Sequence, residues 1–350
     1  MDKFKKIIHT IFIKIKEFYL HYRVFFQRLG VALLTLLLAM IFGFLCIKLM
    51  PGDVVAMYAR NLANTRKIPY EDAYRLAVLA LNYDPNENLF VQLFDYIGSI
   101  LQGDFGTSMY RDDVTVVKII KEFMPWTLLT SGMALLISFI LGVLLGGRMA
   151  VKRKGVENAI SNSYIVVASA IPDYLLGMLL LILLSVRVPI FPKGGNYDIM
   201  LEIEGVSEIA NILYHATLPI IAYSIVQISS WALSMRGSSI GVLGEDYIYA
   251  ARMRGIPERK IRSKYIRRNA LLPLITSFAI SFGAIFGGAP LMEAIFNYPG
   301  FGLEFNNAIG NRDYFLILGM MVFMSFMIIL ANFIADSIYS LIDPRIRREV

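Results

Sequence analysis

The sequence has little from which to build a disulfide framework, a metal centre or a nucleotide-binding loop. It contains one cysteine, Cys46, and three histidines in 350 residues, so no internal disulfide can form and few metal ligands are available. No glycine is followed by lysine, which excludes the Gly-x-x-x-x-Gly-Lys-Ser/Thr loop that cradles phosphates. Charged residues make up only 17%, whereas soluble proteins average about 25%. These shortages exclude a disulfide-rich secreted domain and argue against a soluble protein.

The sequence is rich in long stretches without charged residues. Hydrophobic residues make up 57% of the chain and the mean hydropathy is +0.59. Five stretches contain no charge, and a sixth contains only Asp173: 29–47, 123–147, 209–235, 269–292, 314–335 and, with Asp173, 158–186. About 20 residues of helix cross a hydrocarbon core of about 30 Å. We therefore predict an all-α, polytopic membrane protein with six transmembrane helices.

Basic residues are distributed unevenly between the connecting segments. Of the 34 lysines and arginines, 23 lie in 1–28, 148–157, 236–268 and the C-terminal tail. Basic loops stay on the cytoplasmic side, so we expect both termini in the cytoplasm, and the net charge of +7 needs no nucleic-acid partner. The predicted organisation is a basic amphipathic cytoplasmic segment at 1–28, a first transmembrane helix at 29–50, an extracellular helical cap at 51–122, transmembrane helices two to six at 123–342 with a cytoplasmic loop at 236–268, and a cytoplasmic tail at 343–350.

Two of these segments have an internal pattern. The first 28 residues alternate basic and apolar side chains, which fits a helix lying on the anionic inner leaflet or an extension of the first transmembrane helix. In the cap, a helix start at 69–72 precedes an apolar-periodic stretch at 73–81, and a second amphipathic stretch at 89–101 ends at Gly103.

The cytoplasmic loop 236–268 is the most informative segment. It predicts a helix over 245–254 that Gly255 ends, followed by a second helix that Pro257 opens. Ala250 and Ala251 place two small side chains near the turn, where another protein could approach the backbone closely. A structured basic loop of this kind indicates docking to a cytoplasmic partner, although Gly255 is also explained as a plain helix stop.

The residue pattern of this loop resembles that of a known family. Tyr249-Ala250-Ala251, then Gly255 and Leu272-Pro273, resembles the EAA loop of the membrane subunits of ATP-binding-cassette importers. The B-type subunit of the oligopeptide, dipeptide and nickel branch is similar over roughly 28–348. Further matching motifs are Pro51-Gly52-Asp53, Gly103-Asp104-Phe105-Gly106-Thr107-Ser108, Pro299-Gly300-Phe301-Gly302, Asn311-Arg312-Asp313-Tyr314 and Asp343-Pro344-Arg345. The chain departs from the pattern at Tyr249, at Val54 and in its basic N-terminal extension.

The resemblance implies a type I importer permease fold in a bacterial or archaeal plasma membrane. The implied partners are a homologous second permease, two ABC ATPase subunits that use ATP and Mg, an extracellular or periplasmic substrate-binding protein and a peptide. By this resemblance the chain is not an enzyme and binds no cofactor or metal itself. An oligopeptide is the expected substrate, and a dipeptide or nickel chelate is the alternative. An ion-coupled secondary transporter is the rival class.

The resemblance and the sequence together nominate three groups of site residues. The ATPase-docking group is Glu245, Asp246, Tyr247, Ala250, Ala251, Arg252, Arg254 and Gly255. The candidate translocation path is Asp173, Pro172, Gly283 and Gly287, and the outer-face loop is Glu293, Pro299 and Gly300. Asp173 is an intramembrane ionisable residue, which is alternatively explained by an outer vestibule or an interhelical hydrogen bond.

One catalytic pattern also occurs. Residues 237–241 read Gly-Ser-Ser-Ile-Gly, which matches the Gly-x-Ser-x-Gly elbow of hydrolases. That elbow follows a strand and needs a histidine nearby, whereas this segment follows a predicted transmembrane helix and His215 lies 24 positions earlier. We interpret the match as accidental.

Overall fold

The computed structural model describes residues 26–46, 48–49, 54–81, 88–111, 114–152, 154–200 and 206–342. Most of the predicted 1–28 segment, the Pro51-Gly52-Asp53 motif and the tail 343–350 lie outside the described residues. Within these ranges the chain is helical and has no strand, apart from an isolated bridge between Thr107 and Thr115.

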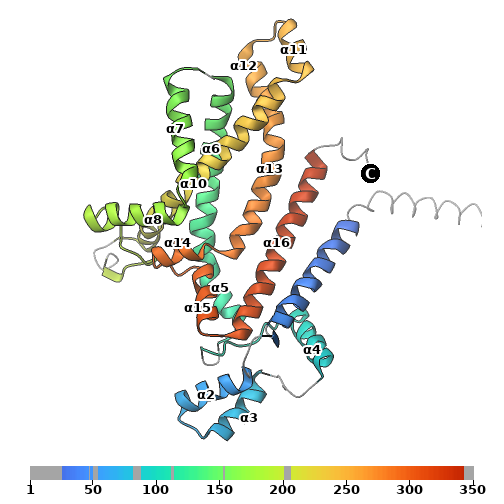
Figure 1. Cartoon of the computed structure of the whole chain (residues 1–350), viewed down its shortest axis with the longest axis vertical. Helices are drawn as coiled ribbons and strands as arrows, with labels where there is room; N and C mark the ends of the chain where they lie inside the picture. Colours follow the sequence, from blue (N-terminus) through green and yellow to red (C-terminus); the bar gives the residue numbers. More distant parts are fainter. Residues whose placement is uncertain are drawn as a thin grey trace, which may run out of the picture.

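Five helices are long and apolar enough to cross a membrane. They are the N-terminal helix Phe26–Cys46; α5 (Val116–Thr127) continuing through η1 (Leu128–Gly132) into α6 (Met133–Val151); α10 (Glu208–Leu243); α12 (Glu258–Lys260) continuing through η3 (Ile261–Ile266), α13 (Arg267–Ala284) and η4 (Ile285–Gly287); and α16 (Tyr314–Ile342). Figure 1 shows α6, α10, α13 and α16 extending along the molecule, with α11 (Asp246–Met253) and α12 at one end and α2 (Val54–Arg66) and α3 (Tyr70–Leu81) at the other. The predicted all-α polytopic fold is confirmed.

The third predicted transmembrane helix is broken, which corrects the expectation of a continuous span over 158–186. Helix α7 (Val156–Ala170) ends at Ile171, and α8 (Asp173–Leu181) with η2 (Ile182–Arg187) leaves at 98° to it. Ile171 is extended, with φ −98° and ψ 124°. A residue before proline is sterically pushed out of the helical region, so Pro172 ends one helix and begins the next.

The fifth transmembrane helix also differs at its ends from the predicted 269–292. It begins at Glu258, within the loop predicted to be cytoplasmic, and stops at Gly287. Gly288 then has φ +74°, and a Cβ there would lie 2.5 Å from Gly302. Only glycine accepts both conditions, so the chain turns here into α14 (Pro290–Ile295) and α15 (Phe301–Gly310).

The predicted cap, as far as the structure describes it, holds three helices. Helices α3 and α4 (Leu89–Leu101) begin and end close to the predicted positions, whereas α2 was not predicted. Helices α2 and α3 form a hairpin whose core includes Val55, Tyr58 and Ala73, and this core packs on Met109 and Tyr314. The cap is therefore attached to the start of α16 by apolar contacts.

The most extensive helix pair in the molecule is α6 with α10. Gly142 and Gly146 lie where α6 meets α10, and a Cβ on Gly146 would overlap the carbonyl oxygen of Ala232. A Cβ on Gly142 would lie 2.8 Å from the carbonyl oxygen of Ile228. Small residues spaced by four let membrane helices bring their backbones together, so these glycines set the distance between α6 and α10.

We expect Gly146→Ala to lower the free energy of unfolding by about 1–3 kcal/mol, because the added methyl group overpacks a closed contact. Gly241→Ala is the matched control, since a Cβ at Gly241 meets nothing within 4 Å and alanine favours helix by up to about 1 kcal/mol. Thermal unfolding of the detergent-solubilised proteins would measure both. Equal midpoints for the two variants would contradict the contact.

Candidate functional site

The end of the molecule opposite the α2–α3 hairpin carries the predicted helix-turn-helix. Helix α11, which we call the docking helix, is capped at Glu245 and ends at Arg254. Its buried residues Ile248 and Ala251 pack with Ile261 and Ile266 of η3. The docking helix is therefore fixed to the helix that enters the membrane as α13.

One face of the docking helix is left uncovered. Tyr249 is 67% exposed and Met253 is 73% exposed, and Asp246 and Ala250 are exposed on the same side of the helix. Residues three or four apart share a helix face, so these four form one surface of mixed apolar and acidic character. Exposed apolar side chains grouped in this way are typical of interaction sites.

Three of the nominated docking residues make contacts within the chain itself. Ala251 is only 4% exposed, so it packs inward and corrects the expectation that both alanines face a partner. Arg252 donates from Nε to Glu258 Oε1 at 2.8 Å, which ties the docking helix to α12. Tyr247 accepts a hydrogen bond from Asn269 Nδ2 at 3.1 Å, a further link to α13.

Gly255 lies at the turn after the docking helix, with Glu245 at the opposite end. It has φ +67°, and nothing lies within 4 Å of the position a Cβ would take. The left-handed backbone favours glycine, while the open space leaves the turn accessible from outside. Arg254 is exposed beside it.

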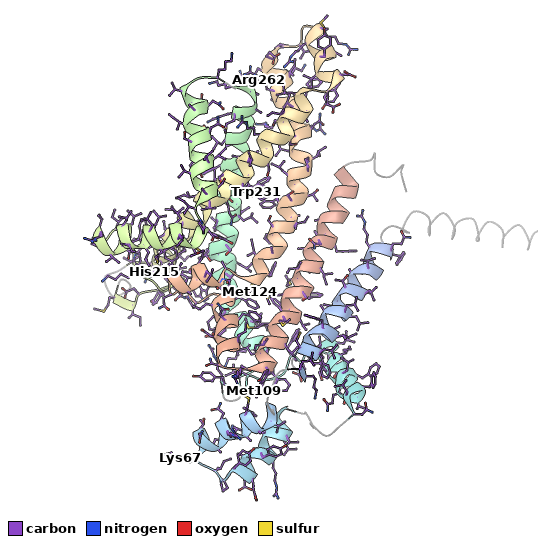
Figure 2. The ribbon with its side chains drawn as sticks, viewed as in Figure 1. Lys67, Met109, Met124, His215, Trp231 and Arg262 are labelled. Carbon is purple, nitrogen blue, oxygen red and sulfur yellow. The ribbon has the colours of Figure 1, made fainter. Side chains whose placement is uncertain are left out.

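A partly open cavity lies between the membrane helices, and we call it the polar chamber after the hydroxyl and amide groups in its otherwise mainly apolar wall. It has a volume of about 300 Å³ and is lined by Ser131, Leu135, Tyr223, Gln227, Ser230, Trp231, Ser281, Ala284, Ile285 and Gly288. Figure 2 places Trp231 between Arg262 at one end of the molecule and Lys67 at the other. The lining contains hydroxyl and amide groups but no charged side chain, so it can hydrogen-bond a neutral polar chain.

Sequence reasoning missed the polar face of α10 that lines this chamber. Tyr223, Gln227 and Ser230 are spaced by four and three positions, which places them on one helix face. Gln227 Oε1 accepts from Ser138 Oγ at 3.1 Å, so α6 orients this amide. The periodicity of polar residues within an uncharged stretch is the signal that could have identified them.

Asp173 lies beside this region. It is the first residue of α8, directly after Pro172, and its Oδ1 accepts from the Tyr174 amide at 2.8 Å. Asp173 interacts electrostatically with Tyr223, a chamber residue. The structure thus places Asp173 at a helix N-terminus, where the dipole favours a carboxylate, and not midway along a continuous helix.

The two glycines nominated for the path face elsewhere. A Cβ at Gly283 would lie 2.7 Å from Ala331 Cβ of α16, and Gly287 has only Met324 Sδ at 4.0 Å. Neither residue lines the chamber. Gly283 therefore packs α13 against α16 within this chain, and its expected place at the path stays a prediction.

The nominated outer-face loop is an internal anchor. Glu293 is 3% exposed and accepts from Thr127 Oγ1 at 2.6 Å and from the Leu303 amide at 2.7 Å. A Cβ on Gly300 would overlap this carboxylate, while Pro299 is half-buried. Glu293 and Gly300 thus hold α14 and α15 on α5, which corrects their expected placement on an exposed surface.

A second buried carboxylate joins two distant motifs. Asp313, which is 1% exposed, accepts from Ser108 Oγ, from the Met109 amide at 3.0 Å and from the Tyr110 amide at 3.2 Å. It also accepts from the Leu316 amide at 3.2 Å, as an N-cap of α16. Figure 2 shows Met109 at this junction, above the α2–α3 hairpin. Asp313 therefore links the loop before α5 to the N-terminus of α16.

A third carboxylate, Glu304 of α15, is 5% exposed. Arg111 donates to its Oε1 at 2.8 Å. Burial raises the pKa of Glu304 above its ordinary value, and Arg111 and Asn307 partly offset this. Burial disfavours the charged form of a carboxyl group. Ionisation of Glu304 therefore costs free energy, and the ion pair with Arg111 offsets part of that cost.

We expect Asp313→Asn to accelerate hydrogen exchange at the Met109 and Tyr110 amides by roughly tenfold or more, because a hydrogen bond to a charged group contributes about 1.5–3 kcal/mol. Asp104→Asn is the control, since exposed Asp104 accepts only from the nearby Gly106 amide among the bonds described here. Exchange followed by mass spectrometry on outer-loop peptides would measure both. Unchanged exchange in Asp313→Asn would refute the anchoring role.

Glu304 should make stability depend on pH. Its raised pKa means that its contribution is fully present below the unfolded pKa and is lost as pH rises through the folded pKa. Glu304→Gln cannot ionise, so its stability relative to wild type should increase with pH. Thermal unfolding from about pH 4 to about pH 8 would test this against Glu122→Gln, whose side chain is 56% exposed. A constant difference between Glu304→Gln and wild type would contradict the shift.

No group of three or more His, Cys, Asp or Glu residues able to hold a metal occurs in the part of the chain that the structure describes. The Gly-Ser-Ser-Ile-Gly sequence at 237–241 lies inside α10, so it forms no strand-to-helix elbow.

Comparisons with known proteins agree with this architecture. A family model described as "Binding-protein-dependent transport system inner membrane component" matches residues 138–348. The oligopeptide transport system permease protein AppB of Bacillus subtilis is 32% identical over 87% of this chain and 93% of its own length. The glutathione transport system permease protein GsiC of Salmonella typhimurium is 31% identical over 89% and 95%. The oligopeptide transport system permease protein OppB of Haemophilus influenzae is 30% identical over 92% and 98%.

The family match covers more than half of the chain, and these relatives align over nearly their whole length. With its apolar helices, the protein is an integral multi-pass membrane protein. The chain belongs to the family of inner membrane components of binding-protein-dependent transport systems, the permease subunits of ATP-binding-cassette importers.

Proposed function

We propose that this chain forms one half of the translocation path of an ATP-driven peptide importer. It would pair with a homologous second permease, while two ATPase subunits hydrolyse ATP with Mg and an external binding protein delivers the peptide. One observation carries the proposal. The docking helix lies between two transmembrane helices, α10 and the helix of α12 to η4, that both line the polar chamber.

The docking helix offers a surface that a separate ATPase can bind. Tyr249 and Met253 supply exposed apolar area, and Asp246 supplies a charge at the exposed N-terminal end. Gly255 leaves space at the turn, where a partner's surface can approach the backbone. Buried apolar area flanked by charges is the usual composition of a specific protein interface.

Movement of the docking helix would reach the chamber directly. Helix α10 runs unbroken from Glu208 to Leu243, and the next helix runs from Glu258 to Gly287. Ile248 and Ala251 bind the docking helix to η3 through apolar contacts. Helices are stiff and packed interfaces shift as units, so closure of two ATPases would pull the cytoplasmic ends of α10 and α13 together with the docking helix.

The chamber favours a substrate recognised by its backbone. Hydroxyl and amide groups of Tyr223, Gln227 and Ser230 can bond peptide N–H and C=O groups whatever the peptide's side chains are. Two relatives are named for oligopeptide transport and one for glutathione transport, which supports an oligopeptide as the first substrate. A dipeptide or a nickel chelate is the alternative within the same family.

The distribution of basic residues supports a location with both termini in the cytoplasm of a bacterial or archaeal cell. The loop that carries the docking helix is among the basic segments, and such segments are retained on the cytoplasmic side. An ATPase in the cytoplasm could then reach it.

The test compares Gly255→Arg with Gly255→Ala in the whole assembled complex. Both substitutions put an L-residue at φ +67°, but only arginine fills the open space beside the turn. We expect Gly255→Arg to lose ATPase co-purification and ATP-dependent oligopeptide uptake in proteoliposomes by at least about tenfold, which corresponds to about 1.4 kcal/mol. Gly255→Ala should retain both within a few-fold.

Two results would contradict the proposal. Wild-type protein that never co-purifies with an ATPase, with uptake that follows an ion gradient, would indicate a secondary transporter. Uptake that a dipeptide or nickel chelate competes for, and an oligopeptide does not, would replace the substrate while leaving the docking role in place.

A further inference from the structure

A cationic cleft opens at the cytoplasmic end of the membrane helices, apart from the polar chamber. It has a volume of about 700 Å³ and is lined by Val143, Leu144, Gly147, Arg148, Val151, Lys152, Glu157, Met235, Ser239, Glu258, Arg259, Arg262, Ser263, Ile266 and Arg267. These residues come from α6, α7, α10 and the helix of α12 to α13. Figure 2 shows Arg262 at this end of the molecule, near the α6–α7 hairpin.

The cleft has an excess of positive charge. Its five cationic residues are Arg148, Lys152, Arg259, Arg262 and Arg267. Its two carboxylates are both occupied, Glu157 by Lys152 at 3.0 Å and Glu258 by Arg252 at 2.8 Å.

Three of the arginines remain for a ligand. Arg148, Arg259 and Arg267 form no ion pair with any described residue. Like charges gathered in one cleft repel each other, so a bound anion would stabilise the arrangement. Arginine also binds phosphate through two parallel hydrogen bonds.

A buried hydroxyl group points to the same ligand. Ser239 lines the cleft, is 1% exposed, and its Oγ has no hydrogen-bond partner among the described residues. An unsatisfied buried polar atom costs about 1–3 kcal/mol. A phosphate oxygen in the cleft would accept the hydrogen bond that Ser239 does not make within the chain.

The other part of the lining is apolar. Val143 and Leu144 of α6, with Met235 of α10, continue the cleft toward the membrane-spanning part of the helices. A free inorganic phosphate gains nothing from contact with this apolar surface. A phospholipid, in contrast, places its phosphate among the cations and its acyl chain on the apolar residues. The inner leaflet is also where anionic phospholipids concentrate.

We propose that this cleft binds an anionic phospholipid of the cytoplasmic leaflet. Arg148, Arg259 and Arg267 hold the phosphate, and Ser239 donates a hydrogen bond to it. The lipid thereby joins the α6–α7 hairpin to the helix that carries the docking helix. This site requires only the membrane orientation and is independent of which substrate is transported.

The test uses the full-length protein, with any partners that co-purify, in nanodiscs of phosphatidylglycerol with phosphatidylcholine or of phosphatidylcholine alone. Native mass spectrometry counts retained phospholipid. We expect wild type to retain phosphatidylglycerol, and Arg259→Gln with Arg267→Gln to bind it at least roughly tenfold more weakly. The matched control is Lys264→Gln with Arg268→Gln, which removes the same charge from the same segment outside the cleft.

Ser239→Ala is the second variant, and it is expected to fold because the removed hydroxyl has no partner among the described residues. It should weaken phosphatidylglycerol retention by about tenfold. Equal losses in the control variant and in Arg259→Gln with Arg267→Gln would overturn the proposal, since they would reflect surface charge alone.

Three further results would also overturn it. The first is retention by wild type of phosphatidylcholine as strongly as phosphatidylglycerol. The second is displacement of phosphatidylglycerol by millimolar inorganic phosphate, which would assign the site to a free anion. The third is loss of a co-purifying protein with unchanged lipid in Arg259→Gln with Arg267→Gln, which would assign the cleft to a protein partner.

Discussion

The arrangement of the membrane helices depends on one contact, in which two glycines let the backbones of α6 and α10 approach each other. Where Gly142 and Gly146 meet Ala232, the backbones of α6 and α10 touch directly, and no larger residue would leave this distance. Both helices line both cavities. Leu135 of α6 and Trp231 of α10 line the polar chamber, and Val143 of α6 and Met235 of α10 line the cationic cleft. The spacing that the two glycines set therefore positions both cavities.

Buried carboxylates join distant elements at the end of the molecule that carries the α2–α3 hairpin. Glu293, Glu304 and Asp313 are each bonded to another element there, beside the apolar contacts of the hairpin. The opposite end combines an apolar cluster around Ile248 and Ile261 with an ion pair from the docking helix to α12. Hydrogen bonds to buried charges are directional and costly to break. Loss of one of the three carboxylates would therefore release elements that are far apart in the sequence.

The long uncharged stretches predicted most of the fold, because every segment that crosses a bilayer must satisfy its own backbone hydrogen bonds. The turn at Gly255 was equally predictable, since its φ of +67° reflects a local glycine preference. The sequence could not reveal the 98° break at Pro172, because proline inside a membrane helix also permits a mild kink. It could not place Ala251, Gly283 or Glu293, since inward or outward placement depends on which helices pack together.

The carboxylate of Asp313 has a consequence for how the protein is made. Its partners Ser108 and Met109 precede it by 205 and 204 residues, and Thr127 precedes Glu293 by 166. A chain synthesised from its N-terminus exposes these donors long before their acceptors leave the ribosome. The loop before α5 therefore cannot make its bonds to Asp313 until the start of α16 has been synthesised.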